Sequence, residues 1–182
     1  MIKILKEEQY FKDIKEIDQE FTSANTSINS TKLPAVFSKV TFQPNTINID
    51  YGGGKFDNVA DYLSKFKVIN LVYDPYNRSS EHNKKVLDLV DDNNGADTIT
   101  CSNVLNVIKE PKVRLNVISN IYKLLKPEGI AYFSVYEGDR SSVGKETTKG
   151  YQLNKPIVEY VSEVEQLFSN VVKKGSIIIA KK

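Results

Sequence analysis

A run of three glycines between two acidic residues is the part of this sequence best suited to bind a nucleotide-like ligand. Residues 52–54 are all glycine, and they come directly after a short apolar run that contains Asp50. Glycines let the backbone approach a ligand closely, and the N-terminus of a following helix offers free amides to it. A second apolar run ends at Asp74, about 20 residues later, where a carboxylate can bind the hydroxyls of a ribose. The order and spacing of these pieces therefore predict a nucleotide-type site.

The pattern around the glycines narrows the class of ligand. A dinucleotide site favours G-x-G-x-x-G, but here the third glycine of that frame is absent and Phe56 lies just inside it. The sequence also contains no G-x-x-x-x-G-K-[ST], which excludes a P-loop. S-adenosylmethionine (SAM) carries no pyrophosphate and needs less space. We therefore expect SAM as the cofactor, with a nicotinamide cofactor as the weaker alternative.

From residue 46 to residue 182 the sequence resembles the class I SAM-dependent methyltransferases. Residues 50–54 (DYGGG) look like the first motif of that superfamily, and residues 97–106 (DTITCSNVLN) look like its fourth-strand motif. Residues 124–133 (LLKPEGIAYF) are similar to its turn into the fifth strand. The resemblance implies a SAM-dependent methyltransferase whose acceptor is a small molecule, a nucleic acid or a protein.

The resemblance also implies a set of cofactor residues, with two departures from the family pattern. Lys55 stands where the first motif often has a further glycine, and no clear strand lies between Asp74 and Asp97, where the family has its third strand. The adenine contact therefore falls either to Asp91 or Asp92, or to residues after the next strand. The residues expected to bind SAM are Asp50, Tyr51, Gly52, Gly53, Gly54, Asp74, Pro75, Cys101, Ser102 and Asn103.

A narrower resemblance leaves a second interpretation open. Residues 74–77 and 103–108 most resemble small phage-type and phosphorothioation-associated methyltransferases. The chain is, in this alternative, a catalytically idle SAM-fold binding or accessory protein of phage origin. The missing motif-one glycine and the missing strand support it.

Methyl transfer from a sulfonium is an in-line displacement, so positioning of the donor and the acceptor provides much of the acceleration. A base is needed only where the acceptor must lose a proton. Glu137 and Asp139 are the candidates for such a group, because they follow the fifth-strand run at the ligand-binding edge. Asn106, Tyr136 and Tyr151 are expected to face the acceptor, the last from a loop that can form a lid.

Other residues that could do chemistry are few. The Asn/Asp-Pro-Pro-Tyr/Phe motif is absent, so methylation of adenine or cytosine amino groups by that motif's chemistry is not expected. Cys101 is the single cysteine, has no preceding proline and fits a small buried strand residue. His82 lies in a polar helical stretch and is interpreted as a surface residue. These two residues alone cannot form a structural zinc site, so no metal is expected.

The elements that position these residues alternate in the order of an α/β fold. Short apolar runs predict strands at 46–50, 68–73, 98–101 and 130–136, and amphipathic stretches predict helices at 58–66, 79–92, 111–125 and 157–168. Residues 137–155 are predicted to form a polar loop, and residues 171–180 an antiparallel hairpin. The predicted fold is therefore Rossmann-like: a mostly parallel sheet flanked by helices, with a C-terminal antiparallel hairpin and a third strand that is short or missing.

Length and composition indicate one domain with an N-terminal addition. The chain has 182 residues, 40% hydrophobic and 26% charged, which is ordinary for a globular domain. Residues 46–182 are expected to form the SAM-binding domain, and residues 1–45, with a helix at 4–21 and a loop at 22–31, a cap or lid. A net charge of +2 does not indicate nucleic acid as a partner, although basic residues gather at 109–126.

The sequence gives only general indications of the cellular compartment and the partners of this protein. No apolar run is long enough to span a membrane, so no membrane partner is expected. The single cysteine and the absence of a signal-like segment favour the cytoplasm. The methyl acceptor and the oligomeric state do not follow from the sequence.

Overall fold

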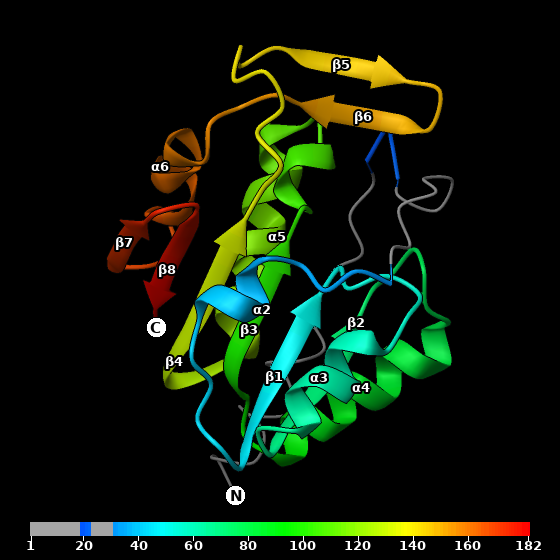
Figure 1. The fold of residues 1–182 in the computed structure, drawn as a ribbon, viewed down its shortest axis with the longest axis vertical. Helices are drawn as coiled ribbons and strands as arrows, with labels where there is room; N and C mark the ends of the chain where they lie inside the picture. Colours follow the sequence, from blue (N-terminus) through cyan, green and yellow to red (C-terminus); the bar gives the residue numbers. More distant parts are fainter. Residues whose placement is uncertain (1–18, 23–30) are drawn as a thin grey trace, which may run out of the picture.

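The computed structural model describes residues 19–22 and 31–182, and its centre is a six-stranded sheet (Figure 1). The strands are β1 (Thr46–Tyr51), β2 (Val68–Tyr73), β3 (Ala96–Ser102), β4 (Leu125–Ser134), β7 (Asn170–Lys174) and β8 (Ile177–Lys181). Their spatial order is β2-β1-β3-β4-β8-β7. The first four are parallel, whereas β8 runs antiparallel to β4 and β7 antiparallel to β8. This arrangement confirms the predicted sheet and its C-terminal hairpin.

Helices cover both faces of the sheet. One face packs against α4 (Ser80–Asp92), α5 (Pro111–Leu124), the 3-10 turn η3 (Ile157–Tyr160) and α6 (Val161–Val164). The other face packs against α2 (Val36–Lys39) and α3 (Asn58–Ser64). Successive side chains of a strand point to opposite faces. In β1, Ile49 therefore enters the larger core, while Asn48 and Asp50 lie on the face that α3 covers.

The third strand of the family pattern is missing from the described chain. Between β2 and β3 the chain forms only α4, and β2 and β3 are the two neighbours of β1. The connection therefore passes over β1 and places α4 on the same face as α5. As a result β2 lies at the edge of the sheet, with Ile69 59% exposed.

The fourth parallel strand begins earlier than predicted. β4 starts at Leu125, and the register pairs Ala96 with Leu125 but Thr98 with Ile130. The predicted turn at 126–129 is therefore a bulge inside the strand, where Glu128 has a φ of 66°. Proline and glycine mark an irregularity in the sequence, but they do not say whether the strand ends there.

Two further predictions need correction. The predicted polar loop at 137–155 contains a hairpin, β5 (Gly144–Thr147) and β6 (Gly150–Leu153), which lies beyond the carboxyl end of β4 (Figure 1). The side chains of β5 are exposed and polar, and β6 has only four residues, all of them half-buried, so no clear apolar alternation marked the hairpin in the sequence. The predicted helix at 157–168 is limited to η3 and α6, which end at Val164. The predicted helix at 4–21 and loop at 22–31 fall mostly outside the described residues.

No helix in the described part of the chain is long and apolar enough to cross a membrane. Within residues 19–22 and 31–182, the histidine, cysteine, aspartate and glutamate side chains form no group of three or more that could hold a metal ion.

Candidate active site

A cavity of about 480 Å³ lies at the carboxyl ends of the parallel strands. The loops after β1, β2 and β3 meet there because parallel strands end at the same edge of a sheet. The predicted residues that line this cavity are Asp50, Tyr51, Gly52, Gly53, Gly54, Asp74, Pro75, Ser102, Asn103, Asn106 and Tyr136. Cys101, Glu137, Asp139 and Tyr151 do not line it. Most of the predicted site is thus brought together, and its binding of SAM stays a prediction.

The glycine turn has no room for side chains. Gly52 has a φ of +76°, which favours glycine, and a Cβ there would lie 2.4 Å from the Cγ2 atom of Val104. A Cβ on Gly53 would lie 2.5 Å from Oδ2 of Asp50. Bare backbone therefore forms this part of the cavity wall, and a ligand can approach main-chain atoms directly.

Asp74 ties the glycine turn to the loop after β2. Its carboxylate accepts hydrogen bonds from the backbone N–H groups of Gly54 at 2.9 Å, Tyr76 at 3.0 Å and Asn77 at 3.0 Å. The side-chain amide of Asn77 also donates to both carboxylate oxygens, at 3.2 and 3.1 Å. Asn83 of α4 pairs with the backbone N–H and C=O of Asp74 at 3.0 and 2.9 Å. This buried acid therefore organises two loops, beyond the ribose contact that its position predicted.

Arg78 supports the glycine turn from outside the cavity lining, although nothing in the sequence marked it. Its Nε donates to the carbonyl of Gly54 at 2.7 Å, and its Nη2 donates to the carbonyl of Phe56 at 2.9 Å and to the Asp57 carboxylate at 2.8 Å. The side chain is only 12% exposed. One arginine in a loop after a strand carries no motif. Its role depends on the fold, which brings the loops after β1 and β2 together.

Asp50 is the end of a chain of buried polar side chains on the sheet face beneath α3. Asn48 donates to Asn70 at 2.7 Å and to the Thr100 hydroxyl at 3.1 Å. That hydroxyl lies 3.2 Å from Oδ1 of Asp50. Burial raises the pKa of Asp50 to about 7, opposed by the Thr100 hydrogen bond and reinforced by the negative charge of Asp74. Asp50 therefore titrates near neutral pH in the folded chain.

This raised pKa predicts a stability that falls as the pH rises from about 4 to about 7. In that window the unfolded chain has lost the Asp50 proton and the folded chain retains it. Each pH unit then lowers the free energy of unfolding by up to about 1.4 kcal/mol. Urea denaturation of the wild type and of Asp50→Asn across this range should show a flatter profile for the variant. Superimposable profiles would contradict the prediction.

The part of the cavity where the acceptor is predicted to bind is formed by η2 (Leu105–Val107), β6 and the chain after β4. Asn106 of η2 is 2% exposed and donates from its side-chain amide to Oε1 of Gln152 at 3.1 Å. Gln152 of β6 donates in turn to the carbonyl of Tyr136 at 3.1 Å. These bonds join the hairpin to the ends of β3 and β4. Gln152 lies inside the predicted lid, but no sequence signal distinguished it from its neighbours.

Comparison with known proteins now assigns the family. A sequence profile for a methyltransferase domain matches residues 28–169, which is well over half of the chain. The chain belongs to this methyltransferase family. No curated protein sequence matches it. Membership favours methyl transfer over the nicotinamide alternative, while the narrower phage-type resemblance stays a prediction.

Solved methyltransferase structures share the fold. The 1,6-didemethyltoxoflavin-N1-methyltransferase of Burkholderia thailandensis, with 1,6-didemethyltoxoflavin and S-adenosylhomocysteine (SAH) bound, has a TM-score of 0.58 at 14% identity, over 77% of this chain and 72% of that one. PigF with SAH has a TM-score of 0.56 at 20% identity, over 82% of this chain and 54% of PigF. A protein from Listeria monocytogenes assigned as a SAM-dependent methyltransferase has a TM-score of 0.52 at 13% identity, over 81% and 96%. At these identities the likeness establishes the fold alone.

The two carboxylates predicted as bases are engaged elsewhere in this methyltransferase-family chain. Glu137 accepts from the backbone N–H of Ile157 at 2.8 Å, and this bond together with Arg140 lowers its pKa. Asp139 accepts from Ser141, and its pKa is lowered by that bond and by Lys145. Neither side chain lines the cavity. Lowered pKa values and this placement both disfavour a role in taking a proton from the acceptor.

The N-terminal segment crosses the rim of the methyltransferase cavity. Phe21 stacks on Tyr151, with ring centroids 6.0 Å apart, so Tyr151 contacts this segment instead of the cavity. Glu20 forms a 2.8 Å ion pair with Lys109, and Gln19 lines the cavity. These contacts place residues 19–22 beside the hairpin. A cap or lid role for residues 1–45 stays a prediction.

The two alternatives for the adenine contact differ in position. Asp91 and Asp92 lie at the exposed end of α4 and do not line the cavity, whereas Ser102 and Asn103 do. Asn103 has a φ of 59°, and its backbone N–H donates to the carbonyl of Ser134 at 2.9 Å. The geometry therefore favours the residues after β3.

The cysteine and the histidine lie outside the cavity lining. Cys101 is 1% exposed and burial raises the pKa of its thiol, as for a buried strand residue. His82 is half-buried, with its ring Nε2 2.8 Å from the carbonyl of Val72, so it is less exposed than predicted.

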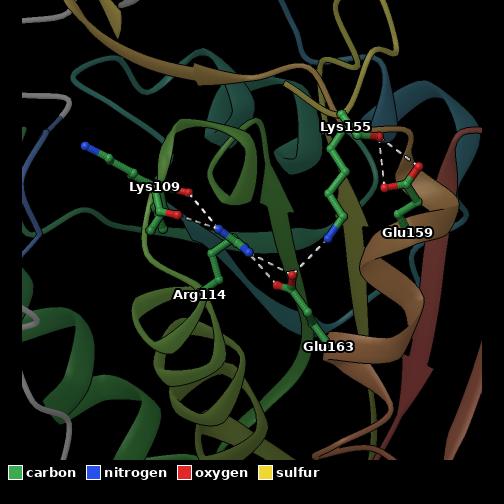
Figure 2. A network of polar contacts seen from close by, with 7 residues as sticks. Lys109, Arg114, Lys155, Glu159 and Glu163 are labelled. Carbon is green, nitrogen blue, oxygen red and sulfur yellow. Dashed lines mark hydrogen bonds and ion pairs between the residues drawn. The ribbon is translucent and has the colours of Figure 1, made fainter. Parts of the chain in front are cut away.

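Arg114 holds the loop that follows η2, on the side of the cavity where the acceptor is predicted to bind. It forms two 2.9 Å bonds to the carboxylate of Glu163, and it donates to the carbonyls of Ile108 and Lys109 at 3.0 and 3.1 Å (Figure 2). Lys155 reaches the same carboxylate at 3.0 Å. Burial alone raises the pKa of Glu163, but the bonds from Arg114 and Lys155 hold it below its usual value. The predicted basic face at 109–126 is therefore partly an internal ion-pair network.

Proposed function

We propose that this chain transfers a methyl group from SAM to an acceptor, with SAM bound over the glycine turn. One observation carries the proposal: residues 52–54, which have no side chains, and Asp74 line the same cavity. The backbone N–H of Gly54 donates a 2.9 Å hydrogen bond to the Asp74 carboxylate and so joins the two. Family membership supports methyl transfer as the reaction. The SAH bound in two structures of the same fold supports SAM as the donor.

The residues present fit SAM. A glycine backbone without side chains leaves room for the amino acid end of the ligand. Asn77 bridges both oxygens of Asp74 through one amide, at 3.2 and 3.1 Å, and a ribose diol offers two O–H donors that can replace it. Asp50 titrates near neutral pH, so a nearby cationic group favours its ionised form.

The chain acts mainly by binding and orientation. Bound SAM supplies a methyl group that its positively charged sulfur activates for displacement. Among the described residues that line the cavity, Asp50 and Asp74 are the only carboxylates, and Asp74 is held by protein donors. Val104 packs against the glycine turn, while Asn106 and Tyr136 lie on the acceptor side. Alignment of the two reactants is therefore the main source of acceleration.

Calorimetry with SAM and SAH tests this proposal. We expect both ligands to bind with dissociation constants of about 100 μM or lower. Gly52→Ala should weaken SAH binding at least about 100-fold, because its Cβ would collide with Val104. Gly175→Ala is the matched control, since Gly175 also has a positive φ of +58° but nothing within 4 Å of a Cβ. Absence of binding, or equal effects of the two substitutions, would refute the proposal.

A catalytically idle binding protein is the second candidate. The observation that favours it is the occupation of both Asp74 oxygens by donors from the chain itself. Radiolabelled methyl transfer from SAM to DNA, RNA, protein or small molecules would exclude this candidate. Lack of binding to SAM and SAH would support it.

A further inference from the structure

Asn106 presents a buried hydrogen-bond acceptor that the described chain does not use. The residue is 2% exposed and lines the cavity. Its Oδ1 atom is buried and, within residues 19–22 and 31–182, accepts no hydrogen bond. Buried polar atoms in folded proteins are nearly always hydrogen-bonded, so an orphan acceptor that lines a cavity is available to a donor bound in that cavity.

The neighbouring amide fixes which atom of Asn106 is the orphan. Gln152 donates from Nε2 to the carbonyls of Tyr136 at 3.1 Å and Leu153 at 2.8 Å. Its oxygen must therefore face Asn106, and it accepts from Asn106 Nδ2 at 3.1 Å. One N–H of the Asn106 amide is used in this bond, which fixes the orientation of the amide and leaves its oxygen as the atom without a partner in the described chain.

The carboxylates in and near the cavity limit the chemical class of the nucleophile. A hydroxyl or thiol acceptor must lose its proton, which calls for a base. The carboxylates in the described cavity lining are Asp50, which is 3% exposed and lies against the glycine turn on the side proposed for SAM, and Asp74, held by several donors. Glu137 and Asp139 lie outside the lining. A neutral amine needs no base, since it carries a lone pair together with an N–H donor.

The acceptor must also be small. Gln19 and Gln152 both line the cavity, and their neighbours in the sequence, Phe21 and Tyr151, stack on each other outside the lining. The whole cavity, which also has to hold SAM, measures about 480 Å³. Little volume therefore remains beside the donor.

We infer, on the basis of the proposed function, that the methyl acceptor is a small, weakly basic primary or secondary amine whose N–H donates to Oδ1 of Asn106. The nitrogen lone pair attacks the methyl carbon as the carbon–sulfur bond breaks, and that bonding pair stays on sulfur, giving SAH. The product is an N-methylammonium, which releases its proton to water. Asn106 orients the lone pair by holding the N–H.

The first experiment is a radiolabelled transfer screen with SAM over arylamines and heteroarylamines, each matched by a phenol, a thiol and a carboxylate of the same skeleton. We expect label only in amines. Asn106→Leu should lower kcat/KM for a labelled amine at least about 100-fold and leave the dissociation constant of SAH within about twofold. Asn93→Leu is the control, because Asn93 donates from its side-chain amide to the carbonyl of Gly95 at 2.9 Å, outside the cavity lining.

A binding measurement separates the inference from the proposed function. On SAH-loaded protein, an amine with an N–H should bind at least about tenfold more tightly than its fully N-methylated counterpart, and Asn106→Leu should remove that difference. Transfer to the phenols, thiols or carboxylates, or no transfer to any amine by a protein that binds SAH, would overturn the inference. Wild-type transfer by Asn106→Leu would overturn it as well. Failure to bind SAH at all would instead refute the proposed function on which it rests.

Discussion

Asp74→Ala is expected to raise the dissociation constant of SAH about 100-fold and to lower the free energy of unfolding by about 2–4 kcal/mol. The substitution leaves the backbone N–H groups of Gly54, Tyr76 and Asn77 without their acceptor. Because Asp74 is 3% exposed, water replaces those bonds only if the loops open. The glycine turn then loses its connection to the loop after β2. Calorimetry and urea denaturation measure the two effects.

Asp92→Ala is the matched control for Asp74. This substitution removes an aspartate carboxylate from the exposed end of α4, outside the cavity lining. It should change neither the dissociation constant of SAH nor the free energy of unfolding measurably. The effects of Asp74→Asn on SAH binding and on the free energy of unfolding should lie between those of Asp74→Ala and Asp92→Ala, since the amide oxygen of asparagine can still accept hydrogen bonds. Unaltered SAH binding by Asp74→Ala would show that the loop connection is not needed for the ligand.

Arg114→Leu is expected to lower the free energy of unfolding by about 3–5 kcal/mol. The Arg114 side chain is 5% exposed and its partner Glu163 is 12% exposed, so loss of the guanidinium leaves a partly buried carboxylate whose remaining ion pair, within residues 19–22 and 31–182, is with Lys155. The carbonyls of Ile108 and Lys109 also lose their donor. Urea denaturation measures the loss. Methyl transfer should fall too, because Ile108 lines the cavity.

Two further variants test whether the loss of stability in Arg114→Leu comes from its ion pair with Glu163. Lys84→Ala breaks an exposed pair with Asp88, whose side chains are 73% and 58% exposed, and should cost less than about 0.5 kcal/mol. Combining Arg114→Leu with Glu163→Leu should destabilise less than the sum of the single substitutions, because the unpaired carboxylate is gone. Strict additivity would mean that the two side chains do not act as a pair.

The candidate site was most predictable where it depends on short segments. An apolar strand, a glycine turn and a helix are encoded within one stretch of chain, so the positions of Gly52 and Asp74 could be inferred before the fold was known. The hairpin at 144–153 could not be inferred, because its strands have four residues each and only the half-buried β6 contains apolar side chains, which is too short a pattern to predict a strand. Glu137 and Asp139 were placed at the correct edge of the sheet, but their local hydrogen bonds turn them to other partners.

The sequence by itself determined the order of the motifs along the parallel strands, a third strand that is short or missing, and the three-glycine turn, since each follows from residue types in local order. The tertiary structure alone decided what surrounds that turn. Arg78 reaches Gly54 across 24 positions, Asn106 meets Gln152 across 46, and Arg114 meets Glu163 across 49. Such contacts leave no local pattern in the sequence. They form only because the sheet brings the ends of particular strands together at one edge. The raised pKa of Asp50 has the same origin, since burial by distant segments removes the water that would stabilise its charge.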